Sequence, residues 1–260
     1  MFVKSLGYRM DLSFPGFKGE VIDRGDYLVI RTPDNPSYYW GNYLLFDAPP
    51  TPSDFDRWRD LFYKEIGKQP NIKHEAFGWD SPSGEMGHIE PFLEAGYNLN
   101  NCSVLTTSRV GLPPYFNPDV VVRTVETDEE WEMAGICASC YATRVTAVND
   151  RIRKHMIAWR AVSQRDAGKW YGAFLQGVLV GGLGIYTVDE TGVIDNVVTH
   201  PDFRERGVGR SLVYLASLHA METLGVKKLL LSTDNGSAAK RMYEQVGFRT
   251  VEQQLGIDTA

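Results

Sequence analysis

The residues of this chain with the clearest chemical potential lie in a turn rich in glycine and arginine, Arg204–Arg210, which reads Arg-Glu-Arg-Gly-Val-Gly-Arg. An apolar run, 193–198, precedes the turn, and a segment with helical apolar periodicity, 211–224, follows it. Backbone N–H groups converge in such a turn, and the helix adds its unpaired first-turn donors and its positive dipole end. Glycine permits φ > 0 and close approach of a ligand. The pattern therefore predicts a phosphate or pyrophosphate site.

Ordered elements are predicted on both sides of this turn. They follow a segment with several prolines, 111–118, that we interpret as a linker. The expected strands are 120–124, 170–175, 178–186, 193–198, 228–231 and 248–255. The expected helices are 129–141, 151–165, 208–224 and one that begins at Ser237 or Ala238 and ends at Val246. Gly225 and Gly247 are placed to end the last two helices. This order predicts an α+β fold around a mostly antiparallel sheet.

The first half of the chain repeats part of this order. The sequence Pro91–Tyr97 resembles Met242–Phe248, and strands at 42–46 and 71–79 and a helix at 55–66 are predicted before it. We therefore expect a degenerate internal repeat. The segment that corresponds to the glycine turn, Asp47–Asp56, has three prolines, three acids, no glycine and no basic residue. Because proline lacks an N–H and carboxylates repel phosphate, the first half should not bind the anion.

Composition argues against several classes of function. The 260 residues, 43% of them hydrophobic, can bury a sizeable core in one large or two small domains. A net charge of −6 argues against a broad basic face for nucleic acid. We expect no membrane span and no signal peptide, and the odd count of three cysteines favours a reducing, cytoplasmic location. Cys137 and Cys140 form a C-x-x-C without a second ligand pair, so we expect packed thiols and no metal.

Two motifs resemble those of the GCN5-related N-acetyltransferase (GNAT) superfamily. Residues 196–212 resemble its acyl-CoA-binding motif, a strand and a proline followed by [QR]-x-x-G-x-[GA]. Residues 235–248 resemble its second motif, an Asn-containing turn and a helix that ends in Tyr-x-x-x-Gly-Phe. The resemblance implies a mixed, mostly antiparallel sheet flanked by helices, splayed to hold acyl-CoA between its fourth and fifth strands. It also implies a catalytic GNAT domain at 119–260, a linker at 111–118 and, at 1–110, a truncated GNAT-like domain without the cofactor loop.

The resemblance carries roles over to matching residues. Tyr243 would protonate the leaving CoA thiolate. Asn235 would touch the CoA arm, although it lies eight residues before Tyr243, where the family's Asn lies seven before, and Gly236 takes the usual place. The other residues implied to contact the cofactor are Val197, Val198 and Thr199 along the pantetheine arm, and Arg204, Glu205, Arg206, Gly207, Val208, Gly209 and Arg210 at the pyrophosphate.

The general base is not given by the motifs. A free alkylamine is mostly protonated at pH 7, so a base, or water relayed to one, must take its proton. Some family members carry a carboxylate on the fifth strand, but this chain has Leu229-Leu-Leu-Ser232 there. Asp195 on the fourth strand is the nearest candidate and Asp234 the next. The basic run Arg151–His155 is predicted to be a solvated helix face, the alternative being contact with an anionic group of the acceptor or of CoA.

We thus expect an enzyme that moves an acetyl group from acetyl-CoA, as co-substrate, to a small-molecule or peptidyl primary amine by direct attack in a ternary complex. No nucleic acid, membrane or metal is expected as a partner, and a homodimer is left open. The alternatives are a longer acyl group, and an acyl-CoA-binding regulatory or interaction protein without catalysis. The aromatic-rich first half either forms the core of a small domain or also closes one side of the acceptor site, which the loop 141–150 would help to shape.

Overall fold

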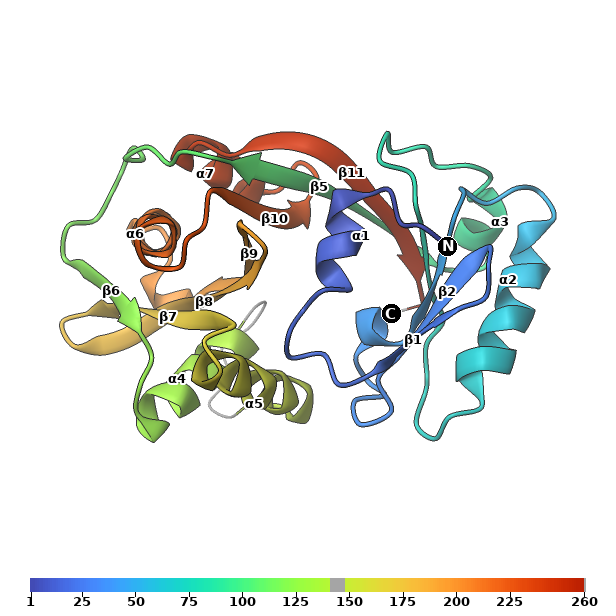
Figure 1. Ribbon diagram of the computed structural model, residues 1–260, viewed down its shortest axis with the longest axis horizontal. Helices are drawn as coiled ribbons and strands as arrows, with labels where there is room; N and C mark the ends of the chain where they lie inside the picture. The colour runs from blue at the N-terminus through green and yellow to red at the C-terminus, as the bar shows by residue number, and fades with distance from the viewer. Residues whose placement is uncertain (141–147, 260) are drawn as a thin grey trace.

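The structure, a computed structural model, describes residues 1–140 and 148–259. Their strands form an eleven-stranded sheet with helices on both faces (Figure 1). The strands are β1 (Glu20–Asp23), β2 (Tyr27–Arg31), β3 (Tyr43–Phe46), β4 (Ala76–Trp79), β5 (Asn98–Thr107), β6 (Val120–Thr124), β7 (Gly168–Leu175), β8 (Val178–Val188), β9 (Thr191–Thr199), β10 (Lys228–Asp234) and β11 (Arg249–Asp258). The helices are α1 (Leu6–Asp11), α2 (Asp54–Phe62), α3 (Glu90–Glu94), α4 (Asp128–Ser139), α5 (Asp150–Gln164), α6 (Val208–Thr223) and α7 (Ala238–Val246), with short turns η1 (Tyr39–Gly41), η2 (Tyr63–Gly67) and η3 (Pro201–Phe203).

The predicted α+β fold is confirmed, and so is the order of elements in the second half. The strand pairs are antiparallel except β3–β4 and β9–β10. Gly225 and Gly247 follow α6 and α7 with φ of 66° and 115°, a conformation that glycine adopts without strain. Residues 141–147, which include the end of one predicted helix and most of the expected loop 141–150, lie outside the described residues.

The internal repeat is visible in the order of elements. β3, α2, β4, α3 and β5 follow one another as β9, α6, β10, α7 and β11 do, and the first two strands of each series are parallel. The two short sequences that resemble each other, Pro91–Tyr97 and Met242–Phe248, directly precede β5 and β11. The repeated order predicted from the sequence is therefore confirmed.

The two repeats exchange their last strands. The sheet order is β1-β2-β3-β4-β11-β5-β10-β9-β8-β7-β6, so β5 from the first half lies between β10 and β11, and β11 lies between β4 and β5. β5 and β11 pair antiparallel along most of their length and arch across the molecule in Figure 1. Backbone hydrogen bonds thus join the halves into one continuous sheet.

Hydrophobic clusters fill both faces of the sheet. In the second half α6 and α7 cover one face and α4 and α5 the other, while in the first half α2 and α3 cover one face and α1 packs on the opposite face. Met10 and Phe14, from α1 and the segment after it, also pack against the α5 cluster of the second half. The first eighteen residues therefore contact both halves, and Figure 1 shows α1 between them, beneath β11. No described helix combines the length and the apolar character needed to cross a membrane.

Candidate functional site

The parallel strands β9 and β10 separate after a short stretch of pairing. Thr191, Gly192 and Val193 pair with residues 228–230, and no pairing continues between the remaining parts of these two strands. From Ile194 to Thr199, the edge of β9 that faces β10 therefore has no strand partner. This is the splayed sheet that the sequence resemblance implies.

A bulge in β9 sets the direction of its side chains. Asp195 pairs with Gly184 and Val198 with Gly182, so Asn196 and Val197 together oppose a single residue of β8. Asn196 has φ of 56°. The extra residue resets the alternation of the strand, so that Val197 packs in the α6 cluster and Val198 in the α5 cluster. Asp195 points to the α5 side, where its partners lie.

The glycine turn leads from β9 into α6, as predicted. Gly207 is the N-cap of α6 with φ of 76°, and a Cβ there would lie 2.4 Å from the carbonyl oxygen of Tyr115. The predicted linker braces the turn, because Asn117 Nδ2 donates to the Arg206 carbonyl (2.8 Å) and Asn117 N donates to Ser211 Oγ (2.8 Å). Gly207 is therefore required both for its φ and for the closeness of the linker.

The arginine side chains of the turn bind protein groups. Arg204 Nη2 donates to the Cys140 carbonyl (2.9 Å) and Nε to the Thr199 carbonyl (3.2 Å), and Arg210 Nε donates to Gln245 Oε1 (3.0 Å). The Arg206 guanidinium lies 5.4 Å from the centre of the Phe203 ring. The first-turn N–H groups of α6, which have no acceptor within the helix, thus remain as donors for an anion. Unpaired N–H groups at a helix start can bind a phosphate group.

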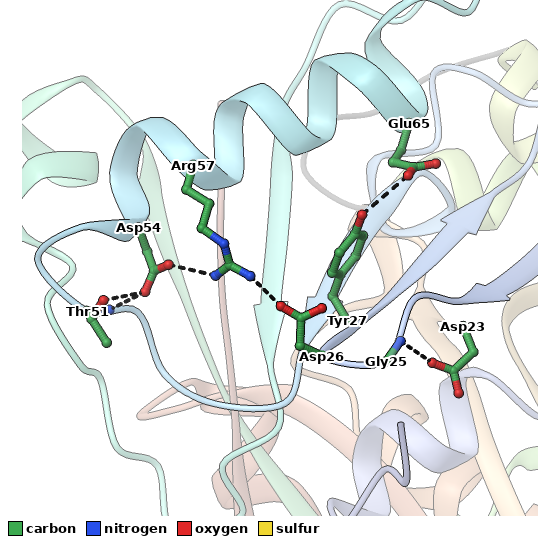
Figure 2. Close-up of polar contacts among 8 residues, drawn as sticks. All are labelled: Asp23, Gly25, Asp26, Tyr27, Thr51, Asp54, Arg57 and Glu65. Atoms are coloured by element: carbon green, nitrogen blue, oxygen red, sulfur yellow. Dashed lines mark hydrogen bonds and ion pairs between the residues drawn. The ribbon is translucent and has the colours of Figure 1, made fainter.

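The corresponding segment of the first half is organised differently (Figure 2). Asp54 opens α2 and accepts hydrogen bonds from Thr51 N (2.8 Å), Thr51 Oγ1 (2.6 Å) and Arg57 Nη1 (2.9 Å), while Arg57 also pairs with Asp26. Burial acts to raise the pKa of Asp54, but the bonds from Thr51 and Arg57 outweigh it and hold this pKa below its ordinary value. A carboxylate thus stands at the helix start, where the second half offers backbone donors.

Removal of this carboxylate is expected to weaken the fold without touching the second half. Asp54→Ala should lower the free energy of unfolding at pH 7 by about 1–2 kcal/mol, because Thr51 loses its acceptor and Arg57 keeps only Asp26. The pKa of Asp54 is lower in the folded chain than in the unfolded chain. The loss of unfolding free energy in the variant is therefore complete above the ordinary pKa of aspartate, and it becomes smaller as the pH falls below that value. Urea unfolding of the variant measures the loss. An unchanged midpoint would contradict this role for Asp54.

Tyr243 and Asn235 have clear places in the structure. Tyr243 is buried in the cluster between α6, α7 and the sheet, with its ring centre 6.2 Å from that of Phe248. Asn235 Oδ1 accepts from Ser103 Oγ (3.1 Å) and Lys240 Nζ (3.0 Å), so it joins the end of β10 to β5. Asp234, the second candidate base, lies next to Cys102, whose thiol donates to its carboxylate (3.8 Å).

Asp195 forms a polar cluster with two residues of α5. Its Oδ2 lies 3.2 Å from His155 Nε2 and accepts a hydrogen bond from Trp159 Nε1 (3.0 Å). Burial acts to raise the pKa of Asp195, but His155, through its hydrogen bond and its charge, and Trp159 outweigh it and hold the pKa below its usual value. Asp195 is therefore a carboxylate at neutral pH, able to orient the imidazole and stabilise a positive charge on it.

A glycine in β8 makes room for this cluster. A Cβ on Gly184, which pairs with Asp195, would lie 2.3 Å from the Trp159 ring. Trp159 is fully buried, and its indole occupies the space that any other residue at 184 would fill. The indole N–H reaches Asp195 for this reason.

Asp195 and His155 line a cavity of about 520 Å³ between the two halves. Its other walls come from α1 and the segment after it, from Tyr38, Trp40 and Tyr43 of the first half, and from β5 and β11. The aromatic first half shares one sheet with the second half and lines this cavity together with it. Its role in closing an acceptor site remains a prediction. In the described parts of the chain, no group of three or more His, Cys, Asp or Glu is placed to hold a metal.

The prediction of a solvated basic face was wrong for His155. Its side chain is 20% exposed and is held by Asp195, whereas Arg151 on the same helix is exposed. A signal was present, because His155 lies four residues before Trp159 and next to Met156, both buried on the face toward the sheet. No sequence pattern predicts a role for Asp11. This residue lies far from residues 196–248 in the chain, but it lines the same cavity as Asp195.

Comparisons with known proteins agree with this geometry. Residues 133–248 match the model of the acetyltransferase (GNAT) family. No curated protein matches the chain significantly in sequence. A conserved protein of unknown function from Staphylococcus epidermidis has a similar structure, with a TM-score of 0.70 and 17% identity over 93% of this chain and 94% of that one.

Two further solved structures extend the likeness over both halves. A GCN5-related N-acetyltransferase from Kribbella flavida has a TM-score of 0.67 and 15% identity over 98% of this chain and 96% of that one. A tandem GNAT protein from the clavulanic acid biosynthesis pathway has a TM-score of 0.50 and 12% identity over 83% of this chain and 76% of that one. At these identities the likeness shows the fold.

Proposed function

We propose, from the match of residues 133–248 to the model of the GNAT family, that the chain transfers an acetyl group from acetyl-CoA to a primary amine. One observation carries the proposal. The turn that leads into α6, where an anion would bind, follows directly after the unpaired edge of β9, and Asp195 on the same strand faces a cavity large enough for a small acceptor. A cofactor groove and an acceptor cavity therefore meet at β9.

The groove offers one set of groups to each part of acetyl-CoA. The first-turn N–H groups of α6, at Val208, Gly209 and Arg210, would hold the pyrophosphate. Val197, Val198 and Thr199, on the unpaired edge of β9, would lie along the pantetheine arm. The bound co-substrate supplies a thioester whose carbonyl carbon the amine attacks, forming the C–N bond and breaking the C–S bond.

The pair His155–Asp195 supplies the base. His155 Nε2 lies 3.2 Å from Asp195 Oδ2 and 3.1 Å from Trp159 Nε1; in the tautomer whose Nε2–H donates to Asp195, Nδ1 would take the proton of an incoming ammonium group. The carboxylate of Asp195 then stabilises the imidazolium that results. The second amine proton leaves after attack, so that one amide, one thiol and one released proton account for all atoms and charges.

Backbone at the bulge would stabilise the charge that develops on the thioester oxygen. An oriented N–H at this point contributes about 2.7–4 kcal/mol in characterised acyl-transfer enzymes. The N–H of Val197 would be such a donor, because β9 has no strand partner on the β10 side from Ile194 to Thr199, whereas the N–H of Asn196 is engaged with Asp195.

Tyr243 is proposed to protonate the departing thiolate. Tyr243→Phe removes the hydroxyl and keeps the buried ring, so kcat should fall about tenfold to a hundredfold while the Kd for acetyl-CoA changes little. Steady-state kinetics with the true acceptor and calorimetry with acetyl-CoA measure the two quantities. Full kcat in the variant would remove Tyr243 from the chemistry.

The proposed function is tested with the intact chain, acetyl-CoA and a panel of amines. Binding is followed by calorimetry and acetylated product by mass spectrometry. Tight binding together with an acetylated amine supports the transferase. Binding with slow hydrolysis and no acetylated product across the panel would instead favour an acyl-CoA-binding regulatory protein.

A further inference from the structure

We propose that the acceptor is a compact amine with one positive charge on an apolar, ring-bearing body, and that Asp11 is a specificity residue that receives its ammonium group. The inference rests on the proposed transferase function, because it assigns the cavity beside Asp195 to the acceptor. It adds the class of substrate and a residue outside the GNAT motifs.

The cavity walls favour an apolar ring. Aromatic side chains reach the cavity from the first half, at Tyr38, Trp40 and Tyr43, and from the segment after α1, at Phe14. The Phe14 ring lies 5.9 Å from that of His155, measured between ring centres. Pockets of roughly 300–1,000 Å³ hold small molecules, and this cavity of about 520 Å³ falls within that range. Aromatic faces also attract cations, which suits an amine with an apolar body.

Two carboxylates in the cavity can receive the ammonium group. Asp11 Oδ2 accepts a hydrogen bond from Gln254 Nε2 (2.7 Å), and its charge acts on that of Asp195. Desolvation raises the pKa of Asp11 to about 6, the bond from Gln254 opposes this, and repulsion by Asp195 adds to it. A cation between the two carboxylates would relieve this repulsion, which is the electrostatic reason to expect a charged amine here.

The N-terminal segment closes the cavity and limits the length of the acceptor. Its backbone is fixed to the second half, because Tyr186 Oη donates to the Met10 carbonyl (2.7 Å) and Arg165 Nη2 donates to the Pro15 carbonyl (3.2 Å). The other end of the segment is fixed as well, because Leu6 N donates to Glu252 Oε2 (2.6 Å). A wall held at both ends favours a compact molecule over a protein chain or a long polyamine.

The expected pH dependence follows from the charges around Asp11. The other ionisable groups of the cavity are Asp195, His155, Lys154, Lys18, Asp34 and Cys102, together with four tyrosines, Tyr8, Tyr38, Tyr43 and Tyr186. Lys154 pairs with Asp150 (3.1 Å), and burial raises the pKa of Cys102 to about 12, so this thiol stays neutral. As the pH falls through about 6, Asp11 gains a proton and its attraction for an ammonium group is lost. KM for the amine should therefore rise below this pH.

The test compares 2-phenylethylamine and cyclohexylmethylamine with spermidine and a lysine-containing peptide as acceptors. The wild-type chain should acetylate the ring-bearing amines with kcat/KM about a hundredfold above the other two. Asp11→Asn should raise KM for them about tenfold to a hundredfold, keep kcat within about threefold, and remove the rise of KM below pH 6. Asn keeps an acceptor for Gln254, so the fold should persist. Asp60→Asn, at an exposed aspartate of α2, is the matched control and should change nothing.

The outcomes separate this inference from the proposed function. Preference for spermidine or the peptide, or an unchanged KM in Asp11→Asn, overturns the acceptor class while the transferase stands. Absence of acetyl-CoA binding, or of any acetylated product, overturns the transferase itself. Calorimetry of 2-phenylethylamine with the CoA-saturated chain gives a readout independent of turnover, and Asp11→Asn should weaken that binding by the same factor as KM.

Discussion

Gly209→Asp is expected to weaken the binding of acetyl-CoA about thirtyfold to a hundredfold. Gly209 lies in the first turn of α6, and a Cβ there would lie 3.3 Å from both Met242 Sδ and Thr199 Oγ1. The new carboxylate would therefore enter the space between the end of β9 and α7, where the pyrophosphate is expected. Two unit charges at 4 Å repel by about 4 kcal/mol at an effective dielectric constant of 20, and exposure to solvent reduces this to roughly half. Each 1.4 kcal/mol is a factor of ten in Kd.

The fold should tolerate Gly209→Asp, so a change in the Kd for acetyl-CoA would not result from unfolding. The contacts at 3.3 Å involve side-chain atoms that can shift by a few tenths of an ångström, and an acid in the first turn of a helix is favourable to the helix itself. Gly111→Asp is the matched control, because it adds the same charge in the linker where a Cβ meets nothing within 4 Å. Calorimetry at two salt concentrations should show a smaller effect at high salt. Equal affinities for the two variants would place the pyrophosphate elsewhere.

The turn could be predicted because its information is local. Glycines, a preceding apolar run and a following amphipathic helix occupy about thirty consecutive residues, and each has a direct structural meaning. The structure adds the contacts that distant residues make with the turn. Asn117 and Tyr115, some ninety residues earlier, fix its backbone, and the side chains of Arg204 and Arg210 bind protein groups. Sequence spacing does not encode these contacts.

The exchange of last strands could not be predicted for a similar reason. β5 and β11 follow the same Gly-aromatic motif, so the sequence reveals the repeat. Which strand pairs with which is decided by packing across more than a hundred residues. The cavity beside Asp195 depends on this exchange, because β5 and β11 form part of its wall.

Of the cavity residues, some could be identified from the sequence and others could not. Asp195 was identified as a candidate base from its place on the predicted fourth strand, and the structure gives it the partners His155 and Trp159. The bulge at Asn196 and Val197, which directly follows Asp195, has no signature in the sequence. Asp11 belongs to a segment for which no element was predicted, so its approach to β9 is a property of the tertiary fold alone.

Replacement of His155 by alanine should slow turnover by about two to three orders of magnitude, the larger part of what a positioned base contributes. The Kd for acetyl-CoA should stay unchanged, because His155 lies on the cavity side of β9 and the turn of α6 lies at its end. Without an internal base the reaction would depend on the small fraction of neutral amine in solution. The kcat/KM of the variant should then rise tenfold per pH unit toward the pKa of the amine, near 10.

The matched variants decide which member of the pair accepts the proton. His88→Ala removes an exposed histidine of the first half and should leave kcat unchanged. Asp195→Asn keeps a hydrogen-bond acceptor for Trp159 but removes the charge that stabilises the imidazolium, so we expect a loss of about tenfold to a hundredfold, smaller than that of His155→Ala. Added imidazole should restore part of the activity of His155→Ala and none of that of Asp195→Asn. The reverse order of losses would make Asp195 itself the base and His155 its positioning partner, whereas full activity in both variants would exclude this face of β9 from the proton transfer.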